Sequence, residues 1–107
     1  MTKVTLKTCP WKVEIRSKGH ANYKPGNDVV CAAVSTVCYM LLNFLLSEDP
    51  RVLERYQDDP GDFRLDINPE VSTVDLDTVI SMFRVGIKQI ADNYPDYVSL
   101  EVDYDAF

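Results

Sequence analysis

A long apolar segment, residues 29–46, places the strongest constraint on the fold of this chain. The segment is short for a membrane span and contains Ser35, Thr36, Tyr39 and Asn43, so a buried helix is the better interpretation. Asp28 is a good N-cap, and the segment Ser47-Glu48-Asp49-Pro50 stops the helix. A helix that is apolar almost all round is usually covered by other layers of the protein or shared with a second subunit.

The segments on either side of this helix alternate between polar and apolar residues, which predicts β-strands. Residues 3–7 and 11–17 flank a short break at Thr8-Cys9-Pro10 and form one hairpin, with Trp11, Val13 and Ile15 on one face. Residues 51–57 and 62–68 flank the turn Asp58-Asp59-Pro60-Gly61 and form a second hairpin, although Val52-Leu53 is also compatible with helix. Residues 97–104 form the last strand.

A second helix is predicted to begin near Ser72 or Thr73 and to end at Asn93-Tyr94-Pro95. Asp75 and Asp77 are favourable in its first turn, and an apolar stripe from Leu76 to Tyr94 has helical spacing. The order of elements is therefore β-β-α-β-β-α-β. Grouped hairpins with two helices predict an α+β sandwich with a mostly antiparallel sheet, in a single domain spanning residues 1–107.

Charge and cysteine content exclude several classes of function. The formal net charge of -6 argues against nucleic acid as a partner and is compatible with a basic protein or peptide. Three cysteines, Cys9, Cys31 and Cys38, with no predicted signal peptide, indicate free thiols in a reducing compartment, so we expect a cytoplasmic protein. The spacing of one histidine and three cysteines does not suit a zinc site, and we expect no metal or cofactor.

Cys31 and His20 are the candidate catalytic pair. With Asp28 as N-cap, Cys31 falls in the first helical turn, where unpaired N–H groups and the helix dipole favour a thiolate. A loop of residues 19–27 connects the second strand to this helix, so the imidazole of His20 could reach the thiol and accept its proton. The same first-turn N–H groups could hold an oxyanion.

Two neighbours of this pair have alternative roles. Asp28 either caps the helix or orients His20, and the cap is favoured while a contact with His20 stays open. A carboxylate beside the sulfur opposes thiolate formation, so it should face His20 rather than Cys31. Ser35 lies one turn after Cys31, where its hydroxyl either donates into the site or bonds back to its own helix.

A structural interpretation of the same residues stays open. Cysteines on apolar helices are usually core residues, and a lone histidine in a loop is usually on the surface. Cys38 is predicted to be core, and Cys9 to be a turn residue without special activation.

The segment from Gly19 to Ser35 resembles the signature of the bacterial ribosomal-processing cysteine proteases, the Prp family. The matching residues are Gly19, His20 and Ala21, followed by Gly26 and the run Asp28-Val29-Val30-Cys31-Ala32-Ala33-Val34-Ser35. The resemblance implies a small homodimeric domain and a cysteine endopeptidase that removes a short N-terminal extension from a large-subunit ribosomal protein. It also implies that Cys31 is the nucleophile and His20 the general base, with Asp28 and Ser35 at further motif positions.

The resemblance assigns the connecting loop to substrate binding, through residues Ala21, Asn22, Tyr23, Lys24, Pro25 and Gly26. This loop is one residue shorter than the family form and contains Lys24-Pro25, which stiffens it. Relatives of the family in phages suggest a virion protein as an alternative substrate. A third hypothesis is a dimeric, ribosome-associated binding module without activity.

Overall fold

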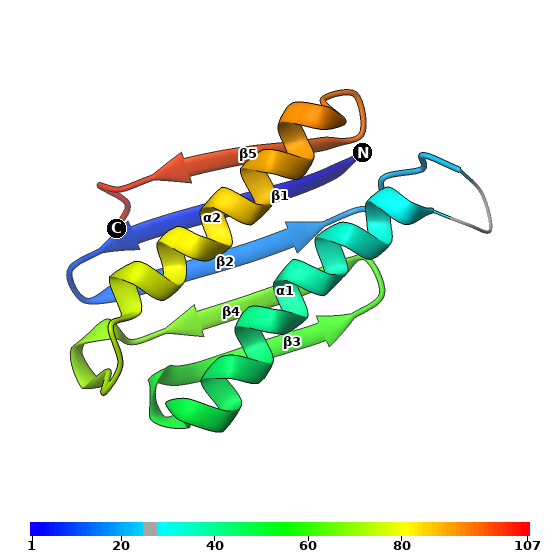
Figure 1. Cartoon of the computed structure of the whole chain (residues 1–107). Helices are drawn as coiled ribbons and strands as arrows, with labels where there is room; N and C mark the ends of the chain where they lie inside the picture. Colours follow the sequence, from blue (N-terminus) through cyan, green and yellow to red (C-terminus); the bar gives the residue numbers. More distant parts are fainter. Residues whose placement is uncertain (25–27) are drawn as a thin grey trace.

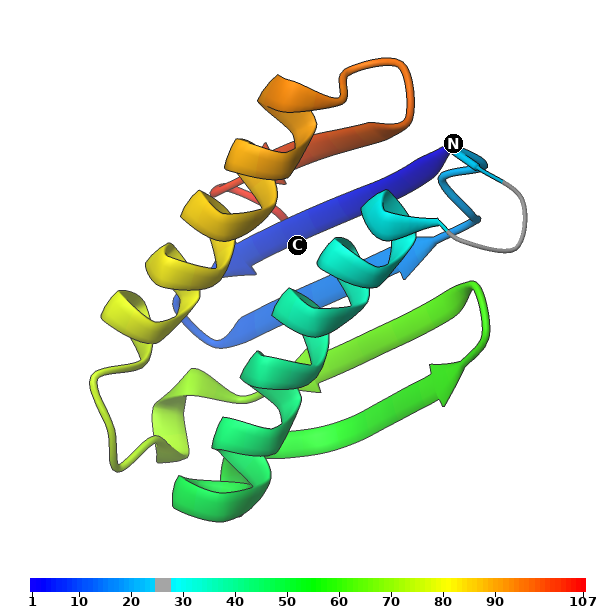
Figure 2. The same ribbon diagram turned by 45° about the vertical axis from the view of Figure 1, so that its right-hand side comes forward.

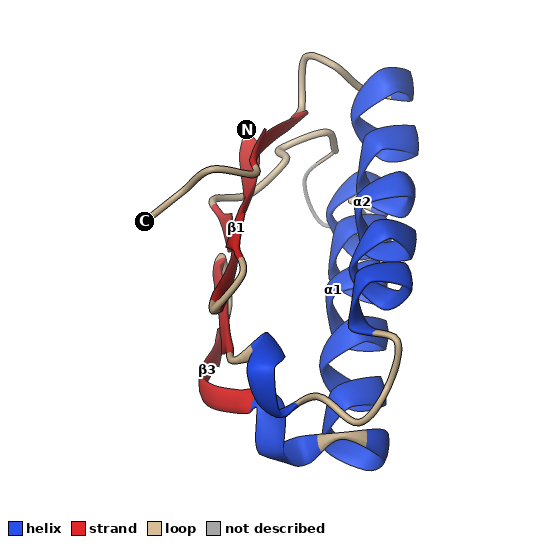
Figure 3. Cartoon of the chain, turned by 90° about the vertical axis from the view of Figure 1, so that its left-hand side faces the viewer, coloured by secondary structure: helices blue, strands red, loops and turns tan. Residues whose placement is uncertain are grey.

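The computed structural model describes residues 1–24 and 28–107 as one sheet with two helices packed against a single face (Figure 1 and Figure 3). The strands are β1 (Thr2–Cys9), β2 (Lys12–Lys18), β3 (Leu53–Asp59), β4 (Asp62–Ile67) and β5 (Val98–Asp103), in the spatial order β3-β4-β2-β1-β5. Only the β1–β5 pair is parallel, and the other three pairs are antiparallel. The predicted α+β class and mostly antiparallel sheet are therefore confirmed.

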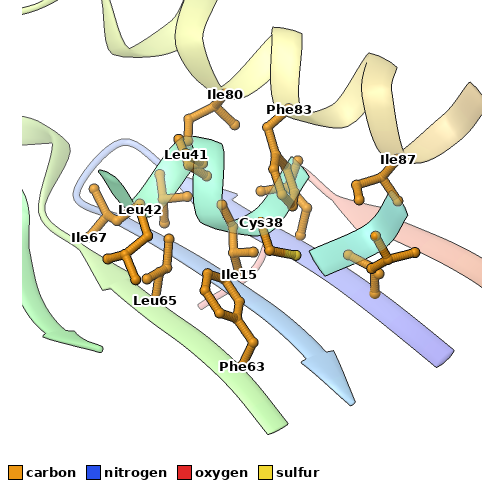
Figure 4. Close-up of a cluster of buried hydrophobic side chains, with 14 of the residues drawn as sticks. Ile15, Cys38, Leu41, Leu42, Phe63, Leu65, Ile67, Ile80, Phe83 and Ile87 are labelled. Carbon is orange, nitrogen blue, oxygen red and sulfur yellow. The ribbon is translucent and has the colours of Figure 1, made fainter. Parts of the chain in front are cut away.

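The alternation along the strands directs one set of side chains toward the helices. Ile15, Leu65 and Ile67 lie in the close-up of the core beneath Leu41, Leu42 and Phe83 of the helices (Figure 4). The other face of the sheet remains uncovered and carries ion pairs such as Lys3–Glu101 and Arg64–Glu14. A charged face of this kind is well solvated, so the hydrophobic core lies entirely between the sheet and the helix layer.

Helix α1 (Val29–Glu48) begins at the predicted cap, because the carboxylate of Asp28 accepts the N–H of Cys31 at 2.8 Å. Its inner side packs on the sheet through Val30, Val34, Cys38, Leu41, Leu42 and Leu45. Its outer side leaves apolar residues such as Met40 and Phe44 exposed. By length and composition, α1 is also apolar enough to cross a membrane. The core helix of a soluble protein can meet the same criteria, and six side chains of α1 are buried in the core.

Helix α2 (Leu76–Asn93) begins later than the sequence predicts. Ser72 and Thr73 have the residue types of N-caps, but both donate hydrogen bonds to Asp49 and neither is the N-cap of α2. Asp75, expected inside the first turn, is the true N-cap and accepts from the N–H of Thr78. A short 3-10 helix, Pro69–Val71, lies between the end of β4 and the start of α2.

Two further boundaries differ from the sequence-based expectation. Trp11 lies in the β1–β2 turn with 55% of its surface exposed, and it does not share the buried face of Val13 and Ile15. β3 begins at Leu53 because Pro50–Val52 forms a 3-10 helix, which Pro50 favours at its first position. In both cases a turn or a 3-10 helix occupies the end of a segment in which polar and apolar residues alternate.

Candidate active site

Cys31 and Ser35 line a cavity of about 80 Å³ between the first turns of α1 and the β3–β4 hairpin. The end of β2, the start of α1 and the β3–β4 turn all lie at the same end of the molecule (Figure 1 and Figure 2). The other residues around the cavity are Thr2, Ser17, Gly19, Val34, Cys38, Tyr39, Asp58, Asp59, Pro60, Gly61, Asp62 and Phe63. The thiol predicted to be the nucleophile is thus accessible from a small hollow and is not sealed in the core.

Asp28 holds the start of α1 and the preceding loop together. One carboxylate oxygen accepts the N–H of Cys31 at 2.8 Å, and the other accepts the N–H of Tyr23 at 3.0 Å. The bond from Cys31 N–H is the main reason that the pKa of Asp28 lies below its ordinary value. Within the described part of the chain, the side-chain hydrogen bonds of Asp28 are these two, and His20 is not a partner of the carboxylate. The structure therefore places Asp28 as a cap.

The N–H groups of the first turn are less available than the sequence suggests. Cys31 N–H is bound by the Asp28 side chain, and Ala32 N–H donates to the Asp28 carbonyl at 3.1 Å. These two N–H groups are therefore not free to bind an oxyanion beside the Cys31 thiol. The Ser35 hydroxyl lines the same cavity and takes part in none of the hydrogen bonds found among residues 1–24 and 28–107.

His20 is exposed and rests on the β3–β4 turn. A Cβ atom built on Gly61 would lie 2.6 Å from Nε2 and 3.0 Å from Cε1 of the imidazole, so the ring occupies the space that a side chain would take. The neighbouring Gly19 N–H donates to the Gly61 carbonyl at 2.8 Å. The structure thus places the imidazole on Gly61, and Gly61 also lines the cavity of Cys31.

The sequence did not indicate that Tyr39 and Asp58 interact beside the site. The Tyr39 hydroxyl donates to the carboxylate of Asp58, and the hydrogen bond raises the pKa of Tyr39 above its ordinary value. The Tyr39 ring packs edge-on against Phe63, with centroids 6.1 Å apart. Tyr39 lies two turns after Cys31 on α1, and this spacing is the one signal that could have indicated its place beside the site.

The described part of the loop is anchored at two points. Ala21 is buried in the core, and Tyr23 packs edge-on against both Tyr94 and Tyr97, with centroids 5.4 and 5.1 Å away. Asn22 adopts a positive φ of 57°, which asparagine tolerates. Lys24 is exposed, whereas Pro25 and Gly26 of the predicted substrate loop lie outside the described residues.

The other two cysteines differ from Cys31. Cys38 is buried, and burial raises the pKa of its thiol to about 12, which keeps it protonated. Cys9 ends β1 and lines a separate hollow beside the start of α2, away from the cavity of Cys31. Within residues 1–24 and 28–107, no three His, Cys, Asp or Glu side chains are grouped so that they could hold a metal ion.

Comparison with known proteins identifies the family. The model of the family described as cysteine protease Prp matches residues 1–99. The chain belongs to the Prp family of cysteine proteases. The ribosomal processing cysteine protease Prp of Mycoplasma pneumoniae is 30% identical over 89 residues, which cover 82% of this chain and 85% of that protein.

Solved structures show the same fold. The ribosomal processing protease Prp of S. aureus, crystallised with a covalently linked product peptide, aligns with a TM-score of 0.78 and 23% identity, over 96% of this chain and all of that one. A Streptococcus mutans protein aligns with a TM-score of 0.72 and 25% identity, over 98% of this chain and 96% of that one. The resemblance to the Prp family seen in the sequence is therefore confirmed.

Proposed function

We propose that this Prp-family protein is a cysteine endopeptidase that removes a short N-terminal extension from a large-subunit ribosomal protein. The observation that carries the proposal is the position of Cys31 in a cavity whose opposite wall, the β3–β4 turn, supports the ring of His20. The Mycoplasma pneumoniae relative is named for ribosomal processing, and the S. aureus relative was crystallised with a substrate peptide. Both names support a peptide substrate.

In the proposed reaction, His20 removes the proton from Cys31, and the sulfur attacks the carbonyl carbon of the scissile bond. When the tetrahedral intermediate collapses, the C–N bond breaks and the imidazolium protonates the departing amine. A thioester to Cys31 remains. Water then attacks this thioester as His20 accepts a proton from the water, and the carboxylate product leaves while the thiol is restored.

Ser35 and Asp28 support this reaction in different ways. The Ser35 hydroxyl donates to the oxygen that becomes negative in the tetrahedral intermediate, because the N–H groups of Cys31 and Ala32 are already bound. Asp28 fixes the start of α1 and, through Tyr23 N–H, the described part of the substrate loop. We assign the remaining residues of the predicted substrate loop, up to Gly26, to peptide binding, as the family resemblance implies.

We place the reaction in the cytoplasm and assign it to a homodimer. The three cysteines are free, which suits a reducing compartment. The net charge of -6 favours encounter with a basic ribosomal protein, whereas nucleic acid would be repelled. The outer side of the helix layer is apolar and gives a second copy a surface to cover.

Peptide cleavage tests the proposal. The substrate is a synthetic peptide covering the N-terminal extension of the ribosomal protein, and mass spectrometry identifies the cut. We expect Cys31→Ala to abolish cleavage and His20→Ala to lower kcat by about 10²–10⁴-fold, the usual contribution of a general base. Cys9→Ser is the matched control and keeps wild-type rates.

Wild-type rates in both the Cys31 and His20 variants would reject the dyad. Cleavage of a virion protein in place of the ribosomal peptide would favour the phage alternative. Tight binding without cleavage would favour the binding module.

A further inference from the structure

The ring of His20 is supported by a single residue of the β3–β4 turn. Gly61 has a φ of +72° and follows Pro60 in this two-residue turn, where glycine adopts the left-handed conformation without steric cost. Its missing side chain leaves the space that the imidazole fills. A Cβ there would lie 2.6 Å from Nε2, 3.0 Å from Cε1 and 3.3 Å from Cδ2.

These three distances mean that any side chain at residue 61 displaces the imidazole. Non-bonded carbon contacts are favourable at about 3.5–4.0 Å, so the ring would have to move by roughly 1 Å. The ring cannot simply stay in place while the turn moves, because Gly19 N–H is hydrogen-bonded to the Gly61 carbonyl at 2.8 Å. Gly19, which precedes His20, and Gly61, which supports its ring, are therefore held together by this hydrogen bond.

The turn is also connected to the helix that carries the thiol. Tyr39 of α1 donates a hydrogen bond to Asp58 at the end of β3. Arg16 of β2 lies 3.6 Å from the carboxylate of Asp62 at the start of β4. The β3–β4 hairpin is thus held to α1 by one contact and to β2 by the other. Because the imidazole packs on this hairpin and the thiol lies on α1, these contacts help to fix the position of the imidazole relative to the thiol.

We infer that Gly61 is a positioning residue for His20: the absence of a side chain at the β3–β4 turn seats the imidazole against Gly61, which lines the cavity that contains Cys31. This inference rests on the proposed function. A general base has to lie within hydrogen-bond reach of the proton that it removes, and a misplacement of about 1 Å can cost as much as 10²-fold in rate. A side chain at residue 61 therefore impairs proton transfer more than peptide binding.

The test compares Gly61→Ala with Gly61→Asn. Both variants add a Cβ against the ring, but asparagine tolerates a positive φ much better than alanine, so backbone strain differs while the steric effect is the same. Gly86→Ala, in α2, controls for the glycine-to-alanine change away from the turn. Circular dichroism and thermal melting establish that each variant is folded.

Two measurements separate the contact from the reaction. His20 is the single histidine of the chain, so its ring protons are resolved in NMR spectra without assignment ambiguity. We expect a nuclear Overhauser effect between these protons and the Gly61 Hα protons in the wild type, and changed chemical shifts of the His20 ring in both Gly61 variants. In peptide cleavage we expect kcat to fall by about 10–100-fold in both variants while KM changes little.

Several results would overturn the inference. Absence of the Overhauser effect in the wild type would disprove the contact, even if both variants failed to fold. Recovery of kcat in Gly61→Asn but not in Gly61→Ala would assign the loss to backbone strain. Unchanged kcat and His20 signals in both variants would show that the ring does not depend on residue 61. If the wild type shows the contact and both variants move the ring, but no cleavage occurs, the proposed function fails and the contact stands.

Discussion

The three thiols of this chain occupy three different environments, and that of Cys31 agrees with its proposed role as the nucleophile. Cys38 is 2% exposed, and burial raises its pKa to about 12. Cys9 ends strand β1 and is not part of a helix; it lines a separate hollow beside the start of α2. Cys31 lies in the first turn of α1 and opens into the cavity, so the positive end of the helix dipole acts on its sulfur.

Alkylation should therefore distinguish the three thiols in the native protein. At pH 6 the proposed dyad predicts that iodoacetamide modifies Cys31 first, because transfer of its proton to an imidazole would leave a thiolate where an ordinary thiol is protonated. Cys38 should stay unmodified until the protein unfolds, since its raised pKa keeps it protonated at any pH well below 12. Peptide mapping by mass spectrometry gives the three rates.

The His20→Ala variant serves as the control for this experiment. Cys31 should lose its advantage over Cys9 in that variant, while Cys38 remains protected. Equal, slow modification of Cys9 and Cys31 in the wild type would argue against an activated thiol.

At the level of secondary structure, a buried carboxylate connects the end of α1 to the segment before α2. Asp49 is 2% exposed and accepts hydrogen bonds from Ser72 Oγ, Thr73 N–H and Thr73 Oγ1 at 2.9–3.1 Å. Burial on its own would raise the pKa of Asp49, but these donors outweigh it and the pKa is lowered. The charged form of Asp49 is therefore the one that the fold stabilises.

Asp49→Asn should lower the melting temperature at neutral pH and reduce the acid sensitivity of the fold. Because the pKa of Asp49 is lower in the folded state, its contribution is present above the unfolded value of about 3.9 and is lost as the pH falls through the folded value. The amide of asparagine cannot accept from all three donors, so part of the contribution is already absent at pH 7. Thermal melts between pH 3 and pH 7 measure both effects.

The matched control is Asp92→Asn, which removes an exposed carboxylate paired with Lys88. This variant should keep the wild-type dependence on pH, because exposed pairs contribute little. An Asp49→Asn variant with wild-type melting across the same range would disprove the role of this junction.

Local patterns in the sequence predicted most elements and failed where distant residues compete. Strand alternation and the Asp28 cap are encoded within a few neighbouring residues, so they could be identified directly. Ser72 and Thr73 have the residue types of helix caps, but their hydroxyl groups donate hydrogen bonds to Asp49, which is more than twenty residues away in the sequence. In the sequence, Gly61 predicted only a turn. Its contact with His20 depends on how the β1–β2 and β3–β4 hairpins are placed relative to each other in the folded protein.

For the molecule as a whole, the two layers present opposite kinds of surface. The uncovered face of the sheet carries ion pairs, including Arg55–Asp66 and Lys3–Glu101. Between the helices lies an apolar groove of about 220 Å³, lined by Val37, Met40, Leu41, Phe44, Val79, Met82 and Phe83. Charged surface stays in water, whereas apolar surface of this kind is typical of contacts between subunits.

We therefore expect the proposed homodimer to form through the helix layer, and Met82→Glu to disrupt it. Met82 is 66% exposed in the single chain, so glutamate at this position costs the isolated fold little but places a charge in the apolar contact. Sedimentation equilibrium should show a wild-type dimer and a dissociation constant raised by at least about 10-fold in the variant, the effect of roughly 1.4 kcal/mol. Lys7→Glu, at an exposed position of β1 on the uncovered face of the sheet, introduces the same side chain and should leave the dimer intact. A monomeric wild type, or a dimer equally stable in Met82→Glu, would show that the helix layer is not the interface. Peptide cleavage by a monomeric Met82→Glu variant would further show whether one chain suffices, since Cys31, His20 and Gly61 all come from the same copy.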